Sequence, residues 1–166
     1  SEFKDNLPYK VIDVDGAEAD DVIAVLTARF APHSDILILS SDKDFAQLQK
    51  YSNVTQYSPT MKHFIKIDDP KRFIREHILR GDRGDGIPNF LSPDNCFAIG
   101  ERQKVLSSKK LNEWISKDMT DICQTDAMLR GYKRNQTLVD FDLLLELLDH
   151  NRMLVLKLQV LVLLLC

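Results

Sequence analysis

The chain of 166 residues is 28% charged with a formal net charge of −3, which fits a globular protein of one domain or of one domain with a small appendage. Its three widely spaced cysteines exclude a disulfide framework and a zinc-binding spacing, and the net charge alone predicts no anionic partner. Basic residues nevertheless gather at 71–83, 102–110 and 130–134. Each of these stretches fits either a nucleic-acid contact or an ordinary solvated helix face.

The first part of the chain alternates between strand and helix patterns. Tyr9–Ile12 is a short apolar strand candidate, followed by a turn at Gly16 and Ala17. Apolar residues at helical spacing predict a helix over Glu18–Phe30, with acids in its first turn. The continuous apolar run within Asp35–Ser40 predicts a buried parallel strand.

The pattern continues to residue 80. A loop at 41–44 leads into a short helix at Phe45–Lys50, and two strands follow at Val54–Tyr57 and His63–Ile67, with a turn at 58–60. Asp69 and Pro70 then begin a helix that runs to about Leu79. We therefore expect residues 1–80 to form an α/β domain with a largely parallel sheet.

The composition changes at Gly81. Residues 81–89 are rich in glycine and turn formers, and Lys109–Lys117 and Thr120–Gly131 are predicted as short helices. We therefore place a helical subdomain at 81–142. The Leu- and Val-rich tail at 143–166 is too short and too interrupted by polar residues to span a membrane, so no membrane contact is expected. A buried or partner-binding helix and a non-native tail both remain open for it.

Three groups of carboxylates lie at predicted junctions between elements. They are Glu18, Asp20 and Asp21, then Asp42 with Asp44, then Asp82 with Asp85. Ligand sites in parallel sheets lie at the carboxyl ends of the strands, so the first two groups can reach one crevice. Mg²⁺ prefers oxygen ligands, and two ions acting on a phosphodiester need about this many acids. Taken singly, each group also fits a helix-capping or turn-forming role.

Other reaction classes fit less well. The chain has no Walker loop, no Ser/His/Asp set suggests itself, and its four scattered histidines are interpreted as surface or core residues. Val11–Gly16, Ser40 and Gly84–Asn89 together resemble motifs of haloacid-dehalogenase-type phosphatases. Ala17 stands where that family commonly has Thr, so this interpretation ranks below a nuclease and below a non-catalytic DNA-binding module.

Three motifs in this order resemble the 5′ nuclease (flap endonuclease) superfamily: GAEADD at 16–21, SSDKDFAQL at 40–48 and GDRGDGIPN at 81–89. Within it, the chain is most similar to the ribonuclease H (5′-3′ exonuclease) group of T-even-type bacteriophages, from about Lys4 to Asp142. The resemblance implies a PIN-like three-layer α/β sheet followed by a helix–three-turn–helix subdomain.

The resemblance also implies roles for individual residues. Glu18, Asp20, Asp21, Asp42, Asp44, Asp82 and Asp85 would form the catalytic set, and two Mg²⁺ ions, which Mn²⁺ can replace, would be bound by Asp20, Asp42, Asp44 and Asp85. The segment from Gly81 to Ser92 would grip duplex backbone through main-chain groups and a K⁺ ion. Nucleic acid would be contacted without sequence preference by Arg83, Gly84, Gly86, Ile87, Arg102, Lys104, Lys109 and Lys110.

The implied reaction is Mg²⁺-dependent 5′-3′ hydrolysis of RNA primers and 5′ flaps, in RNA–DNA hybrids and forked DNA duplexes, during phage DNA replication. It would take place in the cytoplasm of the infected bacterium, beside single-strand-binding and other replication proteins. Family members begin with a strand that carries a metal-binding Asp, and Asp13 and Asp15 do not match that motif. We therefore expect an N-terminally truncated fragment that is weakly active or inactive.

Overall fold

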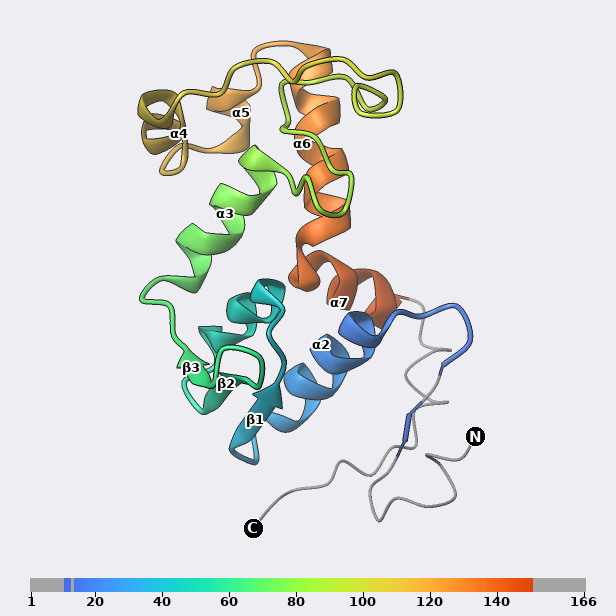
Figure 1. Cartoon of the computed structure of the whole chain (residues 1–166), viewed down its shortest axis with the longest axis vertical. Helices are drawn as coiled ribbons and strands as arrows, with labels where there is room; N and C mark the ends of the chain where they lie inside the picture. The colour runs from blue at the N-terminus through green and yellow to red at the C-terminus, as the bar shows by residue number, and fades with distance from the viewer. Residues whose placement is uncertain (1–10, 13, 151–166) are drawn as a thin grey trace. The chain divides into compact units, whose positions relative to one another are not determined.

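The computed structural model describes residues 11, 12 and 14–150, and side-chain surroundings as far as Glu146. The chain forms two compact units, which meet in sequence between Lys66 and Ile67 and again between Leu143 and Leu144 (Figure 1). The expected strand at Tyr9–Ile12 lies largely outside the described residues, as does most of the tail from 143 onwards. No helix among the described residues is long and apolar enough to cross a membrane.

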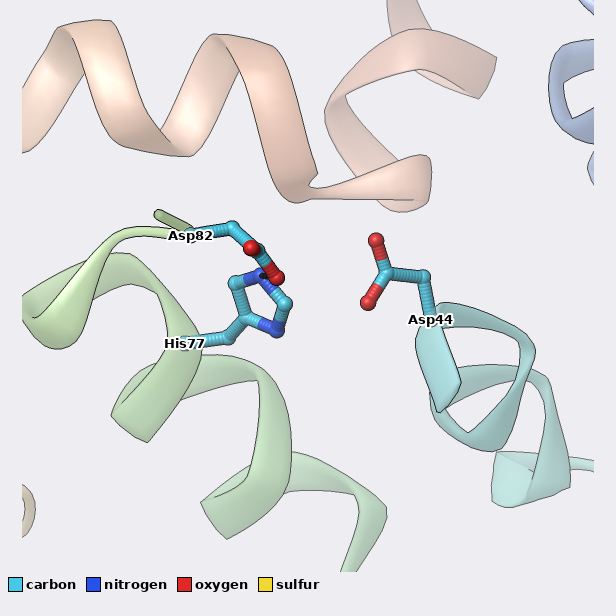
Figure 2. Close-up of side chains that lie close together, drawn as sticks. All are labelled: Asp44, His77 and Asp82. Carbon is cyan, nitrogen blue, oxygen red and sulfur yellow. Dashed lines mark ion pairs between the residues drawn. The ribbon is translucent and has the colours of Figure 1, made fainter. Parts of the chain in front are cut away.

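The first unit is a mixed α/β structure with a small sheet. Helix α2 (Ala19–Phe30) precedes strand β1 (Ile36–Leu39), and the 3₁₀ helix η1 (Lys43–Lys50) connects β1 to β2 (Val54–Ser58) and β3 (His63–Ile65). These elements match the expected ones to within a few residues. η1 packs against β2, and α2 packs against η1. Asp44 lies near the start of η1 (Figure 2).

The strand order is β1-β2-β3, with β1 parallel to β2 and β2 antiparallel to β3. The expectation of a largely parallel sheet is therefore correct for the β1–β2 pair and wrong for the β2–β3 pair. The connection at 59–62 is too short for a parallel crossover, and Lys62 completes the tight turn with a φ of 55°.

The expected burial of β1 is only partly correct. Ile38 is 6% exposed, but Leu37 and Leu39 are 47% and 63% exposed among the described residues. The physical reason is that β1 is an edge strand of the described sheet, and its side chains alternate between two faces.

The second unit contains α3 (Pro70–Arg80), α4 (Ser108–Trp114), α5 (Met119–Ile122) and α6 (Asp126–Val139), and α7 (Phe141–His150) begins at its end. Asp69 begins α3 as expected, because its Oδ1 accepts a hydrogen bond from the Arg72 amide at 2.9 Å and Pro70 fills the first turn. The predicted helix at 120–131 was wrong in its bounds, because the chain forms two helices that are separated at 123–125.

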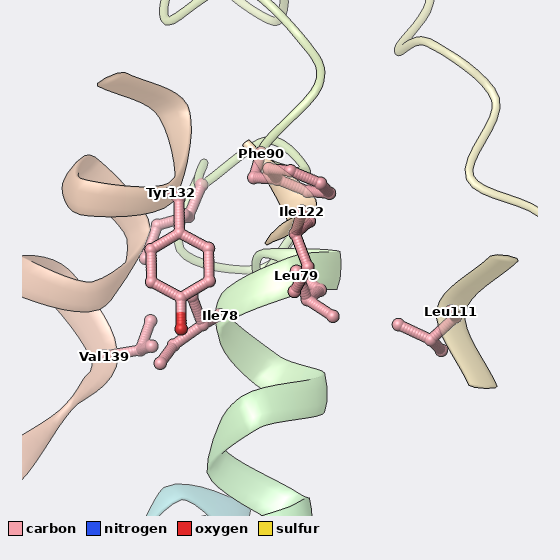
Figure 3. Packing of buried hydrophobic residues seen from close by; sticks show 8 residues of the cluster. Ile78, Leu79, Phe90, Leu111, Ile122, Tyr132 and Val139 are labelled. Atoms are coloured by element: carbon pink, nitrogen blue, oxygen red, sulfur yellow. The ribbon is translucent and has the colours of Figure 1, made fainter. Parts of the chain in front are cut away.

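Apolar residues from α3, α4, α5, α6 and the segment at 81–92 form one buried core in this unit (Figure 3). Phe90 is fully buried and lies edge-on to Trp114 and Tyr132, with ring centroids 5.6 and 6.4 Å away. The cluster consists of Ile78, Leu79, Ile87, Phe90, Leu111, Ile122, Tyr132 and Val139. This core supports the segment at 81–92, which holds four of the eight expected nucleic-acid contacts.

Candidate functional site

The first acidic group lies at the start of α2. Glu18 is the N-cap residue, and its amide donates to Oδ2 of Asp21 at 3.1 Å. The Asp21 amide donates to Oδ1 of Asp20 at 3.1 Å. Local hydrogen bonds therefore fix the carboxylates of Asp20 and Asp21 at the positive end of the helix. Asp20 and Asp21 therefore take part in the helix-capping role that the sequence allowed for this group. The second oxygen of each carboxylate can still bind another ligand.

The second acidic group follows the carboxyl end of β1. Oδ1 of Asp42 accepts from the Asp44 amide at 3.0 Å and caps η1, while the Asp42 amide donates to Oγ of Ser40 at 3.1 Å. Asp42 is exposed and Asp44 is half-buried. Two carboxylates thus stand at the end of a parallel strand, the edge of a sheet where α/β proteins bind ligands.

Gln56 holds the backbone beneath this group from the middle of β2. Its side chain is fully buried, and Nε2 donates to the carbonyls of Ser40 and Asp42 at 2.9 and 2.5 Å. The Ser41 and Ser58 hydroxyls add a contact of 2.7 Å between the same loop and the end of β2. Sequence reasoning missed Gln56, and its only signal was an uncharged polar residue among the strand-forming residues of 54–58.

The structure brings Asp42 and Asp44 together as neighbours, but it does not gather the described acids of the first unit into one cluster. Among the described residues, Glu18, Asp20, Asp21 and Asp42 belong to no group of three potential ligands with atoms within 4.8 Å of one another. The same holds for Asp85 in the second unit.

The third acidic group lies just after α3. Asp82 is buried, and its Oδ2 is 3.5 Å from Nε2 of His77, a residue of the last turn of α3 (Figure 2). Oδ1 of Asp82 accepts from the Gly84 amide at 2.7 Å, which is a turn-forming contact of the kind weighed from the sequence. His77 is buried, which agrees with the expectation that each histidine is either a surface or a core residue. Asp82 and His77 are oxygen and nitrogen donors of the kind that bind divalent metals.

The loop between Asp82 and Ile87 closes on itself. The Ile87 amide donates to the Asp82 carbonyl at 2.6 Å, and Gly86 has a φ of 74°, which only glycine adopts readily. Arg83, Gly84, Asp85 and Gly86 are exposed at its tip. The side chain of Ile87 packs in the core instead, so Ile87 can offer a ligand only its main chain.

Two side chains of α6 anchor the segment that follows this loop. Asn135 is fully buried, and its Nδ2 donates to the carbonyls of Ile78 and Pro88 at 2.7 and 2.9 Å. Arg134 donates to the carbonyls of Pro88, Asn89 and Ser92 at 2.8, 3.3 and 3.3 Å. Sequence reasoning counted Arg134 only among the basic residues and missed Asn135. These residues fix the backbone that carries the expected nucleic-acid contacts.

The remaining expected contacts are exposed basic residues of the same unit. Asn89 ties the backbone of Lys104 to the anchored segment, because its Nδ2 donates to the Lys104 carbonyl at 2.8 Å. Nζ of Lys110 lies 5.3 Å from the centre of the Trp114 ring, which is a cation–π distance. The exposed side chains in this set are Arg102, Lys104, Lys109 and Lys110.

Comparison with known proteins identifies relatives over most of the chain. Residues 1–77 match the family model of the 5′-3′ exonuclease, N-terminal resolvase-like domain. Ribonuclease H of Enterobacteria phage T4 is 39% identical over 148 residues, which are 85% of this chain and 48% of the relative. Flap endonuclease Xni of Shewanella is 29% identical over 147 residues, 80% of this chain and 56% of the relative. The chain thus spans about half the length of these relatives.

Solved structures support the same fold. The T5 D15 protein co-crystallised with metal ions is similar with a TM-score of 0.62, 21% sequence identity and coverage of 83% of this chain and 55% of that one. A point mutant of the T5 5′-exonuclease gives a TM-score of 0.63 at the same identity, with coverage of 83% of this chain and 60% of that one. The solved structures thus show the fold, and the resemblance expected from the three acidic motifs is confirmed by the family model and by the phage T4 relative.

Proposed function

We propose that this chain, whose residues 1–77 match the family model of the 5′-3′ exonuclease N-terminal domain, is part of a metal-dependent 5′-3′ nuclease. The observation that supports this most strongly is the pair of carboxylates at the carboxyl end of β1, inside the region that matches the family. Its substrates would be RNA–DNA hybrids and duplexes with a 5′ flap, in keeping with the names of its relatives.

Two Mg²⁺ ions, or Mn²⁺ in their place, fit the donor set because every expected ligand is a carboxylate. Asp42 would hold the first ion and Asp44 the second, and Asp85 with Asp82 would complete the second site. Asp20 would be a further direct metal ligand, and Glu18 and Asp21 would complete the catalytic set. When bound, such ions supply a nucleophile at neutral pH and stabilise the leaving oxygen of a phosphodiester. The chain's own contribution is to hold these carboxylates through the Asp42 cap, the Gln56 amide and the Asp82–Gly84 turn.

The second unit would supply duplex binding. We assign the first unit to a PIN-like nuclease domain and the second unit to a helix–three-turn–helix subdomain, which begins before α3 and not at Gly81 as the sequence suggested. In this subdomain a K⁺ ion would support the contacts of Gly81–Ser92 with duplex backbone. The exposed side chain of Arg83 would meet phosphates, and so would the basic side chains of Arg102, Lys104, Lys109 and Lys110. Gly84, Gly86 and the main chain of Ile87 would shape the loop that approaches the duplex backbone, because their amides already donate within this loop. Single-strand-binding and other replication proteins of an infected bacterium would be its partners.

A second candidate function is duplex binding without catalysis. The specific observation in its favour is that Asp21 and Asp42 already serve as capping groups in their helices. The phosphatase alternative depends on Asp13, which lies outside the described residues, and the relatives found give it no support.

Single-turnover cleavage of a 5′-flap substrate, with the chain in excess, tests the nuclease proposal. We expect slow cleavage that requires Mg²⁺, and a loss of at least about 100-fold in Asp42→Asn and in Asp85→Asn. Asp69→Asn is the matched control, because Asn also caps a helix and should leave the rate unchanged. Cleavage that persists in excess chelator, or equal rates in all three variants, would contradict the proposal.

A further inference from the structure

One face of α6 carries a basic surface that the proposed contacts do not include. It forms a shallow hollow of about 450 Å³ lined by Asp126, Leu129, Arg130, Lys133, Arg134 and Thr137. These residues follow the three- and four-residue spacing of one helix face. We call this surface the α6 hollow.

The basic side chains of the α6 hollow differ in how exposed they are and in the contacts that they already make. The Arg134 side chain is only 16% exposed and is occupied by backbone carbonyls and by Asp94. The Arg130 side chain is 71% exposed and reaches Asp94 only at 3.7 Å. Lys133 is exposed and forms no ion pair within the described part of the chain. Arg130 and Lys133 are therefore the residues that can bind a ligand, while Arg134 serves as a fixed support.

The position of the hollow indicates which ligand it fits. Arg134 links it directly to the backbone of Pro88, Asn89 and Ser92, which continues the loop proposed to bind duplex DNA. A nucleic-acid backbone held at that loop carries a negative charge about every 1.7 Å along the duplex axis, so neighbouring basic side chains can meet further phosphates.

We propose that the α6 hollow binds a phosphate of the duplex backbone through Arg130 and Lys133, as a second contact surface beside the Gly81–Ile87 loop. This proposal depends on the proposed nucleic-acid function of the second unit. Asp94 lies against both arginines, and its carboxylate occupies the same kind of donors that a phosphate would use. Asp94 therefore competes with the phosphate and weakens binding until it is displaced.

The salt dependence of binding to a fluorescent 20-base-pair DNA duplex, measured by anisotropy with chelator present to prevent cleavage, tests this proposal. The full chain is compared with Arg130→Gln/Lys133→Gln, in which both changes lie on exposed side chains. Each lost phosphate contact lowers the slope of log K against log salt by about 1, so the double variant, which loses its contact with one phosphate, should lose about 1 and bind about tenfold more weakly at low salt. Asp94→Asn should bind more tightly than the parent chain.

Lys71→Gln, which removes an exposed lysine at the start of α3, is the matched control and should leave the slope unchanged. Trp114 fluorescence verifies that each variant keeps the core of the second unit. An unchanged slope in the double variant would overturn the proposal while leaving the nuclease proposal standing. Failure of the parent chain to bind duplex at low salt would overturn it as well. Loss of Mg²⁺-dependent cleavage with normal duplex binding would count against the nuclease proposal alone.

Discussion

Replacement of Gln56 by leucine tests how the loop before η1 is held. The change keeps the side chain near its original volume, so it removes two hydrogen bonds without opening a large cavity. The lost bonds are those from Nε2 to the carbonyls of Ser40 and Asp42, at 2.9 and 2.5 Å. Each contributes about 1 kcal/mol, and a carbonyl that remains buried without a donor costs more. We expect the local free energy of unfolding to fall by about 2–3 kcal/mol.

Native-state hydrogen exchange at the Ser40 amide measures this loss where it occurs. That amide donates to the Tyr57 carbonyl at 3.0 Å and reports the pairing of the end of β1 with β2. A loss of about 2 kcal/mol corresponds to exchange about 30-fold faster. Thr55→Val is the matched control on the same strand, because its exposed hydroxyl makes one long bond of 3.3 Å to the Ile36 carbonyl. Exchange in Gln56→Leu that is no faster than in Thr55→Val would refute the reasoning.

Three further predictions concern the second unit. Asn135→Ala should lower the free energy of unfolding by about 2–4 kcal/mol, because it leaves the buried carbonyls of Ile78 and Pro88 without the Asn135 donor. A denaturation midpoint that is unchanged, as followed by Trp114 fluorescence, would contradict this. Gly131→Ala should cost about 1–3 kcal/mol despite the helix preference of alanine, because the new Cβ would overlap the Phe90 carbonyl oxygen; a gain in stability would disprove this close approach. Burial raises the pKa of the Cys123 thiol, so iodoacetamide should alkylate Cys123 more slowly at pH 8 than it does in urea, as followed by peptide mass spectrometry, and equal rates would argue against that burial.

The elements from α2 to α3 could be predicted because their signals are local. Acids begin α2, an apolar run marks β1, and Asp69 with Pro70 begins α3. The direction of β3 follows from its short connection to β2, but the apolar pattern of 63–67 does not encode it. The exposure of Leu37 and Leu39 depends on which strands flank β1, so the run correctly predicted a parallel strand but wrongly predicted that both of its faces are buried.

The length of α6 shows where local signals fail. The expected helix ended at Gly131, a residue that usually marks a helix end, yet α6 continues through it to Val139. The physical reason is tertiary, because the missing side chain allows the backbone of Phe90 to approach α6 closely. Packing therefore overrides the intrinsic preference at this position.

The acids of the candidate site could be identified from the sequence, but their supports could not. Asp42, Asp44 and Asp82 have recognisable positions at the ends of elements, whereas Gln56, Arg134 and Asn135 act on backbone that is 14 to 57 residues away. Such contacts exist only after folding, and a polar residue within a strand or helix carries no local mark of its partner.

Binding of Mn²⁺, followed by the loss of its free-ion electron paramagnetic resonance signal, tests the central claim that these carboxylates hold divalent metal. It also separates a nuclease from a DNA-binding module, whatever the turnover of this chain. We predict saturable binding by the parent chain and by Asp69→Asn, and binding at least about tenfold weaker in Asp42→Asn and Asp85→Asn. Equal Mn²⁺ binding by all four proteins, or none by the parent chain, would contradict the account.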